Sequence, residues 1–357
     1  LVYRNPIHQE SQGRYNIILN PEQQRIVDAI WEDESHMVSM IHGVTGSGKT
    51  EIYMELIART IAENRQAIVL NPEIALTYQT VMRFYRRFGD RISIIHSRLS
   101  AGEKYDQFQR AENGDIDIMI GPRSALFTPF PRPGLVIIDE EHESSYKSET
   151  TPRYHARETA IELARMESAK VILGSATPSL EAYYRAKKGE YALYTLNRRA
   201  RSSILPEVSV VDMREELKNG NRSIISEALK EQIEKKLQSE EQIMLFLNRR
   251  GYAGFLSCRS CGHVIKCPHC DVSLSVHNYG RMICHYCGYE EKRPEVCPKC
   301  GSTFISTFGI GTQQVEQVVR KIFSHARVLR MDMDTTRTKN GHEKILSAFQ
   351  NQEADIL

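Results

Sequence analysis

The pattern of hydrophobic and polar residues predicts an alternation of buried strands and amphipathic helices along most of the chain. Short apolar runs that predict strands lie at 37–42, 67–70, 92–96, 116–120, 135–139 and 171–174. Helical periodicity lies between them, for example at 51–61 and 158–165. Continuously apolar strands that alternate with helices are typical of a parallel sheet covered by helices on both faces. We therefore expect an α/β fold.

A second unit is expected because residues 200–211 interrupt this rhythm. Its predicted helices and strands lie at 226–238, 243–247, 313–323, 327–331, 342–349 and 354–357. The predicted division is a linker or tail of a preceding domain at 1–18, a first unit at 19–199 and a second at 200–357. Because a predicted core strand is only beginning at residue 354, we expect the chain to be a piece of a longer protein.

Composition and charge add little to this picture. The chain has 357 residues, 41% hydrophobic and 26% charged, which suits a globular protein of about two domains. No apolar run reaches the roughly 18 residues of a membrane span, so no membrane contact and a cytoplasmic location are expected. The net charge is only +2, so nucleic-acid binding would depend on local basic clusters. Such clusters lie at 83–91, 198–201 and 320–339, where a solvated helix face is the alternative.

Residues 43–50, Gly-Val-Thr-Gly-Ser-Gly-Lys-Thr, carry the pattern of a phosphate-binding loop between a strand and a helix. Glycines let backbone N–H groups curl around phosphate oxygens, and the start of the helix adds partial positive charge. Lys49 would reach the β- and γ-phosphates, and the hydroxyl of Thr50 would bind Mg²⁺. We therefore expect ATP and Mg²⁺ to be bound, with predicted contacts at Gly43, Gly46, Ser47, Gly48, Lys49 and Thr50.

A carboxylate pair follows the apolar run at 135–138. Asp139 would hold Mg²⁺ directly or through water, and Glu140 would polarise the attacking water. With Lys49, they are the predicted catalytic residues. A solvated loop or a helix cap is the alternative for such an acidic cluster, and His142 would either sense nucleotide or cap a turn.

Two further kinds of segment indicate more than a generic ATPase. Ser175 and Thr177 follow another apolar run, where their hydroxyls can bridge the phosphate site and a neighbouring lobe. Residues 71–76 and 121–127 also follow predicted strands, at the edge where open parallel sheets bind ligands. Backbone N–H groups and Arg123 at that edge would grip a DNA phosphate backbone, which fixes position without reading sequence.

All eight cysteines form four C-x-x-C pairs within a short stretch, which is typical of two four-thiolate zinc sites. A hairpin pattern between the second and third pairs, with its turn at 278–280, would bring those two pairs together. The first and fourth pairs would then share the other zinc. Glycines after three pairs are expected in turns with positive φ. The predicted ligands are Cys258, Cys261, Cys297 and Cys300 for one zinc and Cys267, Cys270, Cys284 and Cys287 for the other, both structural.

The order of these blocks resembles helicase superfamily 2, and the cysteine module narrows the resemblance to the bacterial primosomal replication-restart helicases, the PriA family. The resemblance implies two RecA-like lobes, the second incomplete and interrupted by a zinc-binding insertion at 256–303. It implies that Gln23 reads adenine, and residues 246–252 look like the fourth motif. In an aromatic-rich loop, Tyr146 and Tyr154 would stack on bases beside Lys147 and Arg153. Alternatively, these tyrosines pack the loop against its own domain.

The resemblance implies an ATP-dependent 3′-to-5′ DNA helicase that acts in replication restart and primosome assembly. Its expected partners are forked and single-stranded DNA, other primosome proteins, single-stranded-DNA-binding protein and the replicative helicase. The family's terminal domains and last motor motifs would be missing. Because the arginine of the final motif would be missing too, we expect the isolated chain to hydrolyse ATP slowly. We also expect the second lobe to be poorly stable.

Two other functions compete with the helicase. One is a zinc scaffold that recruits primosome partners and uses ATP binding only as a switch, against which the intact Asp139 and Glu140 count. The other is the motor subunit of a restriction system, which would require nuclease residues, and none is recognisable in the sequence.

Overall fold

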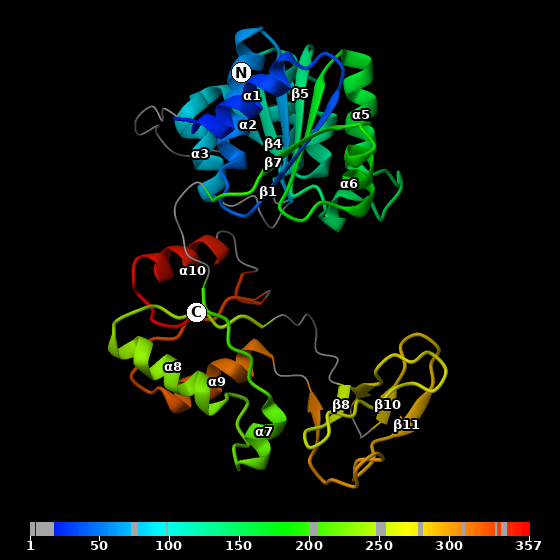
Figure 1. Cartoon of the computed structure of the whole chain (residues 1–357), viewed down its shortest axis with the longest axis vertical. Helices are drawn as coiled ribbons and strands as arrows, with labels where there is room; N and C mark the ends of the chain where they lie inside the picture. The colour runs from blue at the N-terminus through cyan, green and yellow to red at the C-terminus, as the bar shows by residue number, and fades with distance from the viewer. Residues whose placement is uncertain are drawn as a thin grey trace. The chain divides into compact units, whose positions relative to one another are not determined.

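A computed structural model of the chain describes residues 4, 18–72, 78–97, 99–199, 206–247, 255–277, 281–308, 311–332, 334–336 and 341–357. The chain divides into two compact units at 1–205 and 206–357 (Figure 1). Among the helices described, none is both long and apolar enough to cross a membrane.

The first unit is built on a seven-stranded sheet in the order β3-β4-β2-β5-β6-β1-β7, and every neighbouring pair is parallel. This confirms the predicted α/β fold, and such a sheet is typical of RecA-like helicase lobes. β7 was not predicted, because it is an edge strand that is mostly half-buried and lacks a continuous apolar pattern. The strands are β1 (Val38–Gly43), β2 (Gln66–Leu70), β3 (Ile92–Ile94), β4 (Ile118–Gly121), β5 (Pro133–Asp139), β6 (Lys170–Ser175) and β7 (Ala192–Leu196).

Helices cover both faces of this sheet (Figure 1). Alternate residues of each strand face opposite cores: Ile137 packs with α1, α2 and α3, whereas Val136 and Ile138 pack with α4, α5 and α6. Burial of each such side chain contributes roughly 1.5–3 kcal/mol, so both layers stabilise the sheet. The helices are α1 (Pro21–Glu32), α2 (Lys49–Ala62), α3 (Tyr78–Phe88), α4 (Ala101–Glu112), α5 (Ala156–Glu167) and α6 (Leu180–Lys187), with short 3-10 turns η1 (Gly89–Arg91), η2 (Arg123–Phe127) and η3 (Ser144–Tyr146).

The second unit has a smaller core formed by the two helices at 227–238 and 312–322 and by three short extended segments. The strands predicted at 243–247, 327–331 and 354–357 are present only as single-residue parallel pairings, in which Ile356 lies between Ile243 and Val328. Extended segments are present at these positions, but the prediction of regular strands is wrong, because each β-pairing covers a single residue. The predicted helices appear as α8 (Glu227–Gln238), α9 (Thr312–Ile322) and α10 (Gly341–Gln350), after a short α7 (Met213–Lys218).

The cysteine-rich part of the second unit has its own antiparallel sheet in the order β11-β10-β9-β8-β12. The predicted hairpin is confirmed, since β9 and β10 pair Val276 with Met282. β8 pairs with β12, so the chain leaves this part beside the point where it entered. The strands are β8 (Phe255–Cys258), β9 (Ser275–His277), β10 (Arg281–Ile283), β11 (Glu290–Lys292) and β12 (Ile305–Phe308).

Candidate nucleotide site and cysteine clusters

Three neighbouring strands of the first unit end at the same edge of the sheet. β1 ends at Gly43, β5 at Asp139 and β6 at Ser175. The parallel register places Asp139 beside Gly174 and Ser175 beside His42. The fold thus brings together the three segments that the sequence singled out for phosphate chemistry, at the edge where open parallel sheets bind ligands.

The phosphate loop runs from β1 directly into α2, which begins at Lys49. Gly48 has a φ of +86°, and a Cβ atom there would lie 2.1 Å from Nε2 of Gln23, so glycine is required. Nζ of Lys49 donates a hydrogen bond to the carbonyl oxygen of Gly43 at 2.8 Å. The hydroxyl of Ser47 is buried and has no hydrogen-bond partner among the residues described. A buried hydroxyl without a partner fits a ligand oxygen, so the loop suits a phosphate group.

Gln23 links the start of α1 to the phosphate loop. Its Oε1 accepts a hydrogen bond from the N–H of Asn20 at 2.9 Å, and its Nε2 donates to the carbonyl oxygen of Ser47 at 3.2 Å. Gln23 is buried. Both ends of its amide are therefore used by protein groups, and adenine recognition stays a prediction.

Asp139 is half-buried, and its Oδ1 accepts a hydrogen bond from the hydroxyl of Tyr53 at 3.0 Å. Burial, and secondly the charge of Glu140, raise the pKa of Asp139 above its usual value. The Glu140 side chain is 38% exposed, so solvent can reach it. Sequence reasoning missed Tyr53, although it lies one helical turn after Lys49 and hence on the same face of α2.

His142 connects the segment after β5 to the end of β6. Its Nδ1 lies 2.8 Å from the hydroxyl oxygen of Ser175, which also accepts a hydrogen bond from the N–H of Thr177 at 3.0 Å. Ser175 is buried, whereas Thr177 is exposed. The pair His142–Ser175 therefore gives the two segments a direct side-chain link.

A buried ion pair, which sequence reasoning also missed, joins Glu141 to Arg157. Ser179 completes the cluster, because its hydroxyl donates to Oε1 of Glu141 at 2.7 Å and its N–H donates to Oε2 at 3.1 Å. The three residues come from separate parts of the chain. No local spacing in the sequence could have indicated this cluster.

The predicted DNA-binding loop after β5 needs a correction. Tyr146 is buried, and its hydroxyl donates to the carbonyl oxygens of Asp139 at 2.6 Å and Leu70 at 3.0 Å. Tyr146 is therefore not available to stack on a base. It packs against its own domain, which was the alternative interpretation. Nη1 of Arg123 donates to the carbonyl oxygens of Ser145 at 2.8 Å and Lys147 at 2.6 Å, so Arg123 helps to fix the loop, and its contact with a DNA phosphate stays a prediction.

The other loop residues remain candidates for contact with nucleic acid. Tyr154 is half-buried and meets Phe127 edge to face at a ring distance of 5.1 Å, and Phe127 is 53% exposed. Lys147 and Arg153 are exposed. Residues 73–76 and 248–252, which belong to two other predicted motifs, lie outside the described residues.

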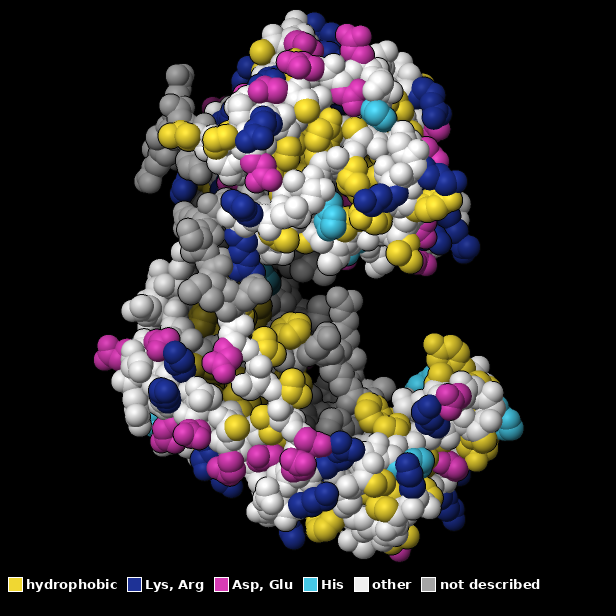
Figure 2. All heavy atoms as spheres, viewed as in Figure 1, with side chains coloured by type: hydrophobic (Ala, Val, Ile, Leu, Met, Phe, Trp, Pro, Cys, Tyr) yellow, Lys and Arg dark blue, Asp and Glu magenta, His cyan; other side chains and the backbone are white. Residues whose placement is uncertain are grey.

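The basic cluster at 83–91 is largely neutralised by acidic partners. Arg83 pairs with Glu51, Arg87 with Glu55 at 2.6 Å, and Arg91 with Asp117. Figure 2 shows basic side chains interspersed with acidic and hydrophobic ones on the visible face, in keeping with the net charge of +2. A solvated helix face therefore describes this cluster.

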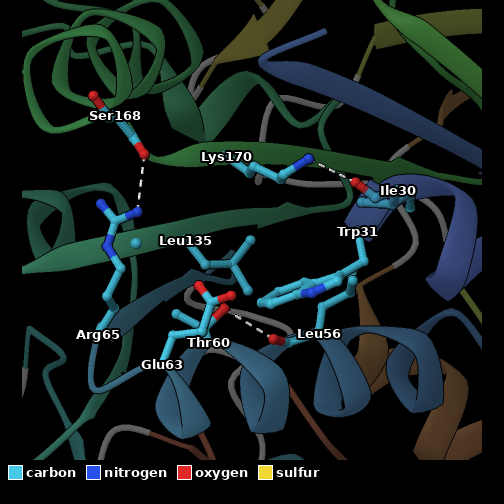
Figure 3. A pocket seen from close by; sticks show the side chains of 10 residues that line it. Ile30, Trp31, Leu56, Thr60, Glu63, Arg65, Leu135, Ser168 and Lys170 are labelled. Carbon is cyan, nitrogen blue, oxygen red and sulfur yellow. Dashed lines mark hydrogen bonds between the residues drawn. The ribbon is translucent and has the colours of Figure 1, made fainter. Parts of the chain in front are cut away.

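A hollow of about 130 Å³ lies at the opposite edge of the sheet, near the start of β5 and β6 (Figure 3). Its two cations are paired within the protein: Arg65 donates to the carbonyl oxygen of Ser168 at 2.9 Å, and Lys170 to that of Ile30 at 2.7 Å. None of the predicted site residues lines it. This hollow therefore lies apart from the candidate nucleotide site.

The eight cysteines gather into two clusters of four sulfurs, each within 4.8 Å of one another. The grouping is the nested one expected from the hairpin. We call the set Cys258, Cys261, Cys297 and Cys300 the outer cluster, and the set Cys267, Cys270, Cys284 and Cys287 the inner cluster.

The geometry of both clusters fits zinc. Sulfur–sulfur distances are 3.6 Å between Cys258 and Cys300 in the outer cluster and 3.6 Å between Cys267 and Cys287 in the inner one. A tetrahedral site with Zn–S distances of about 2.3 Å places its sulfurs about 3.8 Å apart. The expected positive φ angles are present at Gly262, Gly288 and Gly301. Four thiolates leave no open position, so zinc here would be structural.

Two protein families match this chain. The DEAD/DEAH box helicase family matches residues 20–186, which include the candidate nucleotide site. The PriA DNA helicase Cys-rich region (CRR) domain matches residues 267–292, which include the inner cluster.

Curated relatives extend the similarity over the whole chain. It is 51% identical over 361 residues to the replication restart protein PriA of Bacillus subtilis, covering 100% of this chain and 45% of that protein. It is 45% identical over 349 residues to the PriA of Synechocystis sp., covering 95% of this chain and 42% of that protein. The chain thus spans less than half the length of these relatives.

Among solved structures, RecG bound to a three-way DNA junction is similar at a TM-score of 0.48 and 15% identity, covering 96% of this chain and 36% of that chain.

Proposed function

We propose, on the premise that this chain belongs to the PriA family, that it forms the ATP-hydrolysing part of a DNA helicase that acts in replication restart. The observation that carries the proposal is the meeting of the phosphate loop, Asp139 and Ser175 at one sheet edge. The zinc-scaffold alternative, in which ATP is only a switch, leaves the carboxylates of Asp139 and Glu140 without a task.

In this proposal the backbone N–H groups at 43–50 and the ammonium group of Lys49 bind the phosphates of ATP. Lys49 exchanges the carbonyl oxygen of Gly43 for a phosphate oxygen, and the unpartnered hydroxyl of Ser47 donates to another. Asp139 and Thr50 would hold Mg²⁺, which neutralises phosphate charge when bound. Gln23 would contact adenine if its amide were released from its present partners.

Glu140 is the proposed general base. Its side chain is partly exposed at the carboxyl edge of β5, so it can accept a proton from a water molecule that attacks the terminal phosphate. The link between His142 and Ser175 would transmit the state of the phosphate site to the segment after β6, with Ser175 and Thr177 coupling hydrolysis to lobe movement.

For DNA, the exposed Lys147 and Arg153 beside Tyr154 supply cations next to an aromatic ring, which suits a single strand. Family membership supports residues 19–199 as the first RecA-like lobe and 200–357 as a second, incomplete one. It also supports 3′-to-5′ movement, forked DNA as substrate, and primosome proteins, single-stranded-DNA-binding protein and the replicative helicase as partners in the cytoplasm. The two cysteine clusters would hold structural zinc within the second lobe.

The proposal is tested by measuring Mg·ATP binding and ATP hydrolysis with and without single-stranded DNA, in this chain and in the full-length gene product. Lys49→Ala should weaken the binding of the phosphates and lower hydrolysis on the order of 10²-fold, because it removes the cation at the transferring phosphoryl group. Lys188→Ala is the matched control, since Lys188 is an exposed cation packed over Tyr184.

The full-length product should show DNA-stimulated hydrolysis that Lys49→Ala lowers on the order of 10²-fold and Lys188→Ala leaves intact. Binding of ATP without DNA-stimulated hydrolysis in the full-length product would overturn the helicase proposal and favour the scaffold.

A further inference from the structure

Glu140 has a backbone conformation that a residue with a side chain rarely adopts. Its φ is +48°, in the left-handed region, where the Cβ atom crowds the following carbonyl oxygen. Such a conformation persists when the surrounding structure holds the chain on both sides. Since the proposed function assigns the attacking water to Glu140, the groups that hold this residue bear directly on the reaction.

On the upstream side, two tyrosines hold Asp139. The hydroxyl of Tyr53 donates to Oδ1 of Asp139 at 3.0 Å, and the hydroxyl of Tyr146 donates to its carbonyl oxygen at 2.6 Å. Both tyrosines are buried, so water does not compete for these bonds. The residue that precedes Glu140 is therefore fixed through both its side chain and its backbone.

On the downstream side, Glu141 is held by its side chain, which has no exposed surface. One carboxylate oxygen accepts from Nη1 of Arg157 and from the hydroxyl of Ser179, and the other accepts from the N–H of Ser179. Its backbone N–H also donates to the carbonyl oxygen of Gly174 at 3.0 Å. A buried carboxylate needs such a set of donors, and among the described residues Arg157 is the one cation that pairs with Glu141.

Arg157 is itself fixed in place. Its side chain is 8% exposed, its Nε donates to Glu158 at 3.0 Å, and its Nη1 also donates to the hydroxyl oxygen of Ser179 at 2.9 Å. Ser179 is the N-cap of α6, where it accepts from the N–H of Ala182. Arg157 thus ties the start of α5 and the start of α6 to the residue next to Glu140.

We propose, building on the proposed function, that Arg157 is a positioning residue that holds Glu140 in its hydrolytic orientation through Glu141. Without the guanidinium group, the carboxylate of Glu141 would be buried without a cation and would turn toward water. That movement would rotate the backbone on the C-terminal side of Glu140 and release its left-handed conformation. If the ion pair had only a structural role, its removal would lower the stability of the first unit as a whole. It would have no selective effect on the backbone around Glu140.

Amide hydrogen exchange tests the positioning directly, without bound nucleotide. In Arg157→Ala, the N–H groups of Glu141 and Glu143, which donate to the carbonyl oxygens of Gly174 and Glu140, should exchange faster, while those of α2 stay protected. Arg165→Ala is the matched control, because Arg165 lies on the same helix in an exposed pair with Glu162. It should change neither region.

Hydrolysis by the full-length product gives the second readout. Arg157→Ala should lower kcat on the order of 10- to 100-fold, as expected for a misplaced catalytic group, while the Kd for Mg·ATP stays within about twofold of the wild type. Arg157→Lys should restore part of kcat, because a lysine can pair with Glu141 without reaching Ser179 and Glu158 as well.

Unchanged exchange at Glu141 together with an unchanged kcat in Arg157→Ala would overturn the proposal. If the alanine variant lost protection throughout the first unit, Arg157→Gln, which keeps most of the side chain without the charge, would decide: a folded glutamine variant with wild-type exchange and wild-type kcat would also overturn it. If the wild-type product hydrolysed no ATP, the proposed function would fail, and the exchange measurement alone would still test the positioning.

Discussion

The hydroxyl oxygen of Tyr53 lies 3.0 Å from Oδ1 of Asp139, so the helix that begins at the phosphate loop also supplies a donor to the candidate Mg²⁺ ligand. This bond partly compensates the burial of Asp139 beside Glu140. The first turn of α2, from Lys49 to Tyr53, therefore connects the phosphate loop to the carboxylate of Asp139.

Asp139→Asn should make the protein more stable at pH 7 while abolishing ATP hydrolysis. Burial and the neighbouring charge of Glu140 raise the pKa of Asp139, which means that the ionised carboxylate is unfavourable in the fold. Asparagine keeps the size and the acceptor for Tyr53. We expect a gain of about 1 kcal/mol, or roughly 2–4 °C in Tm, by thermal denaturation followed by circular dichroism. Asp115→Asn, at an exposed position, should leave Tm unchanged, and a lower Tm for Asp139→Asn would contradict the argument.

Stability should fall between pH 7 and pH 5 partly because of His155. Burial, and secondly the charge of Arg157, lower the pKa of His155 from 6.5 in the folded protein. The unfolded chain therefore binds more protons in this window, so the stabilising contribution present above pH 6.5 is lost as pH falls toward the lowered value. His155→Asn keeps an N-cap for α5 and should make the difference in Tm between pH 7.5 and 5.5 smaller. An equal difference in both proteins would show that His155 does not carry the effect.

The purified chain should contain two zincs, and cysteine substitutions should remove them in nested pairs. Cys267→Ser and Cys284→Ser should each cost the zinc of the inner cluster, while Cys258→Ser and Cys297→Ser should cost that of the outer one. Metal analysis by mass spectrometry, combined with the double variants, checks this. Cys267→Ser/Cys284→Ser should lose one zinc, whereas Cys258→Ser/Cys267→Ser should lose both. Equal zinc content in the two double variants would refute the nested grouping.

Tyr146 and Tyr154 should have separable effects on the full-length product. Tyr146→Phe removes the donor to the carbonyl oxygen of Asp139, a bond worth about 1 kcal/mol, and should lower basal and DNA-stimulated hydrolysis alike. Tyr154→Ala should raise the DNA concentration needed for half-stimulation about 5- to 100-fold, because base stacking contributes roughly 1–3 kcal/mol, and should leave basal hydrolysis unchanged. Loss of basal hydrolysis in Tyr154→Ala would make Tyr154 a structural residue as well.

The sequence predicted those features that depend on local patterns. The apolar run that ends at Asp139 indicates the end of a strand, and the glycines at 43–48 indicate a turn. Both features can be recognised from local composition alone. The hairpin between the second and third cysteine pairs could be predicted in the same way, because the alternation of apolar and polar residues and the turn residues lie within one short segment.

Features set by packing were not predictable in this way. Nothing near Tyr146 indicates that its hydroxyl reaches the carbonyl oxygens of Asp139 and Leu70, because the contact depends on how η3 packs on the sheet. Arg157 and Glu141 are separated by a loop, and a buried ion pair across it leaves no periodic signal. Edge strand β7 was missed for a related reason, since half-buried strands show no continuous apolar run.

The pairing of β8 with β12 has a consequence for how such a protein can change over time. Phe255 lies opposite Phe308, so the cysteine-rich part departs from the rest of the second unit and returns to it at one place. A cassette whose ends already meet can be lengthened, shortened or grafted elsewhere without altering the path of the polypeptide that carries it. Recombination could therefore exchange this cassette as a whole, and a tight turn joining 258 to 305 would be the least disruptive deletion.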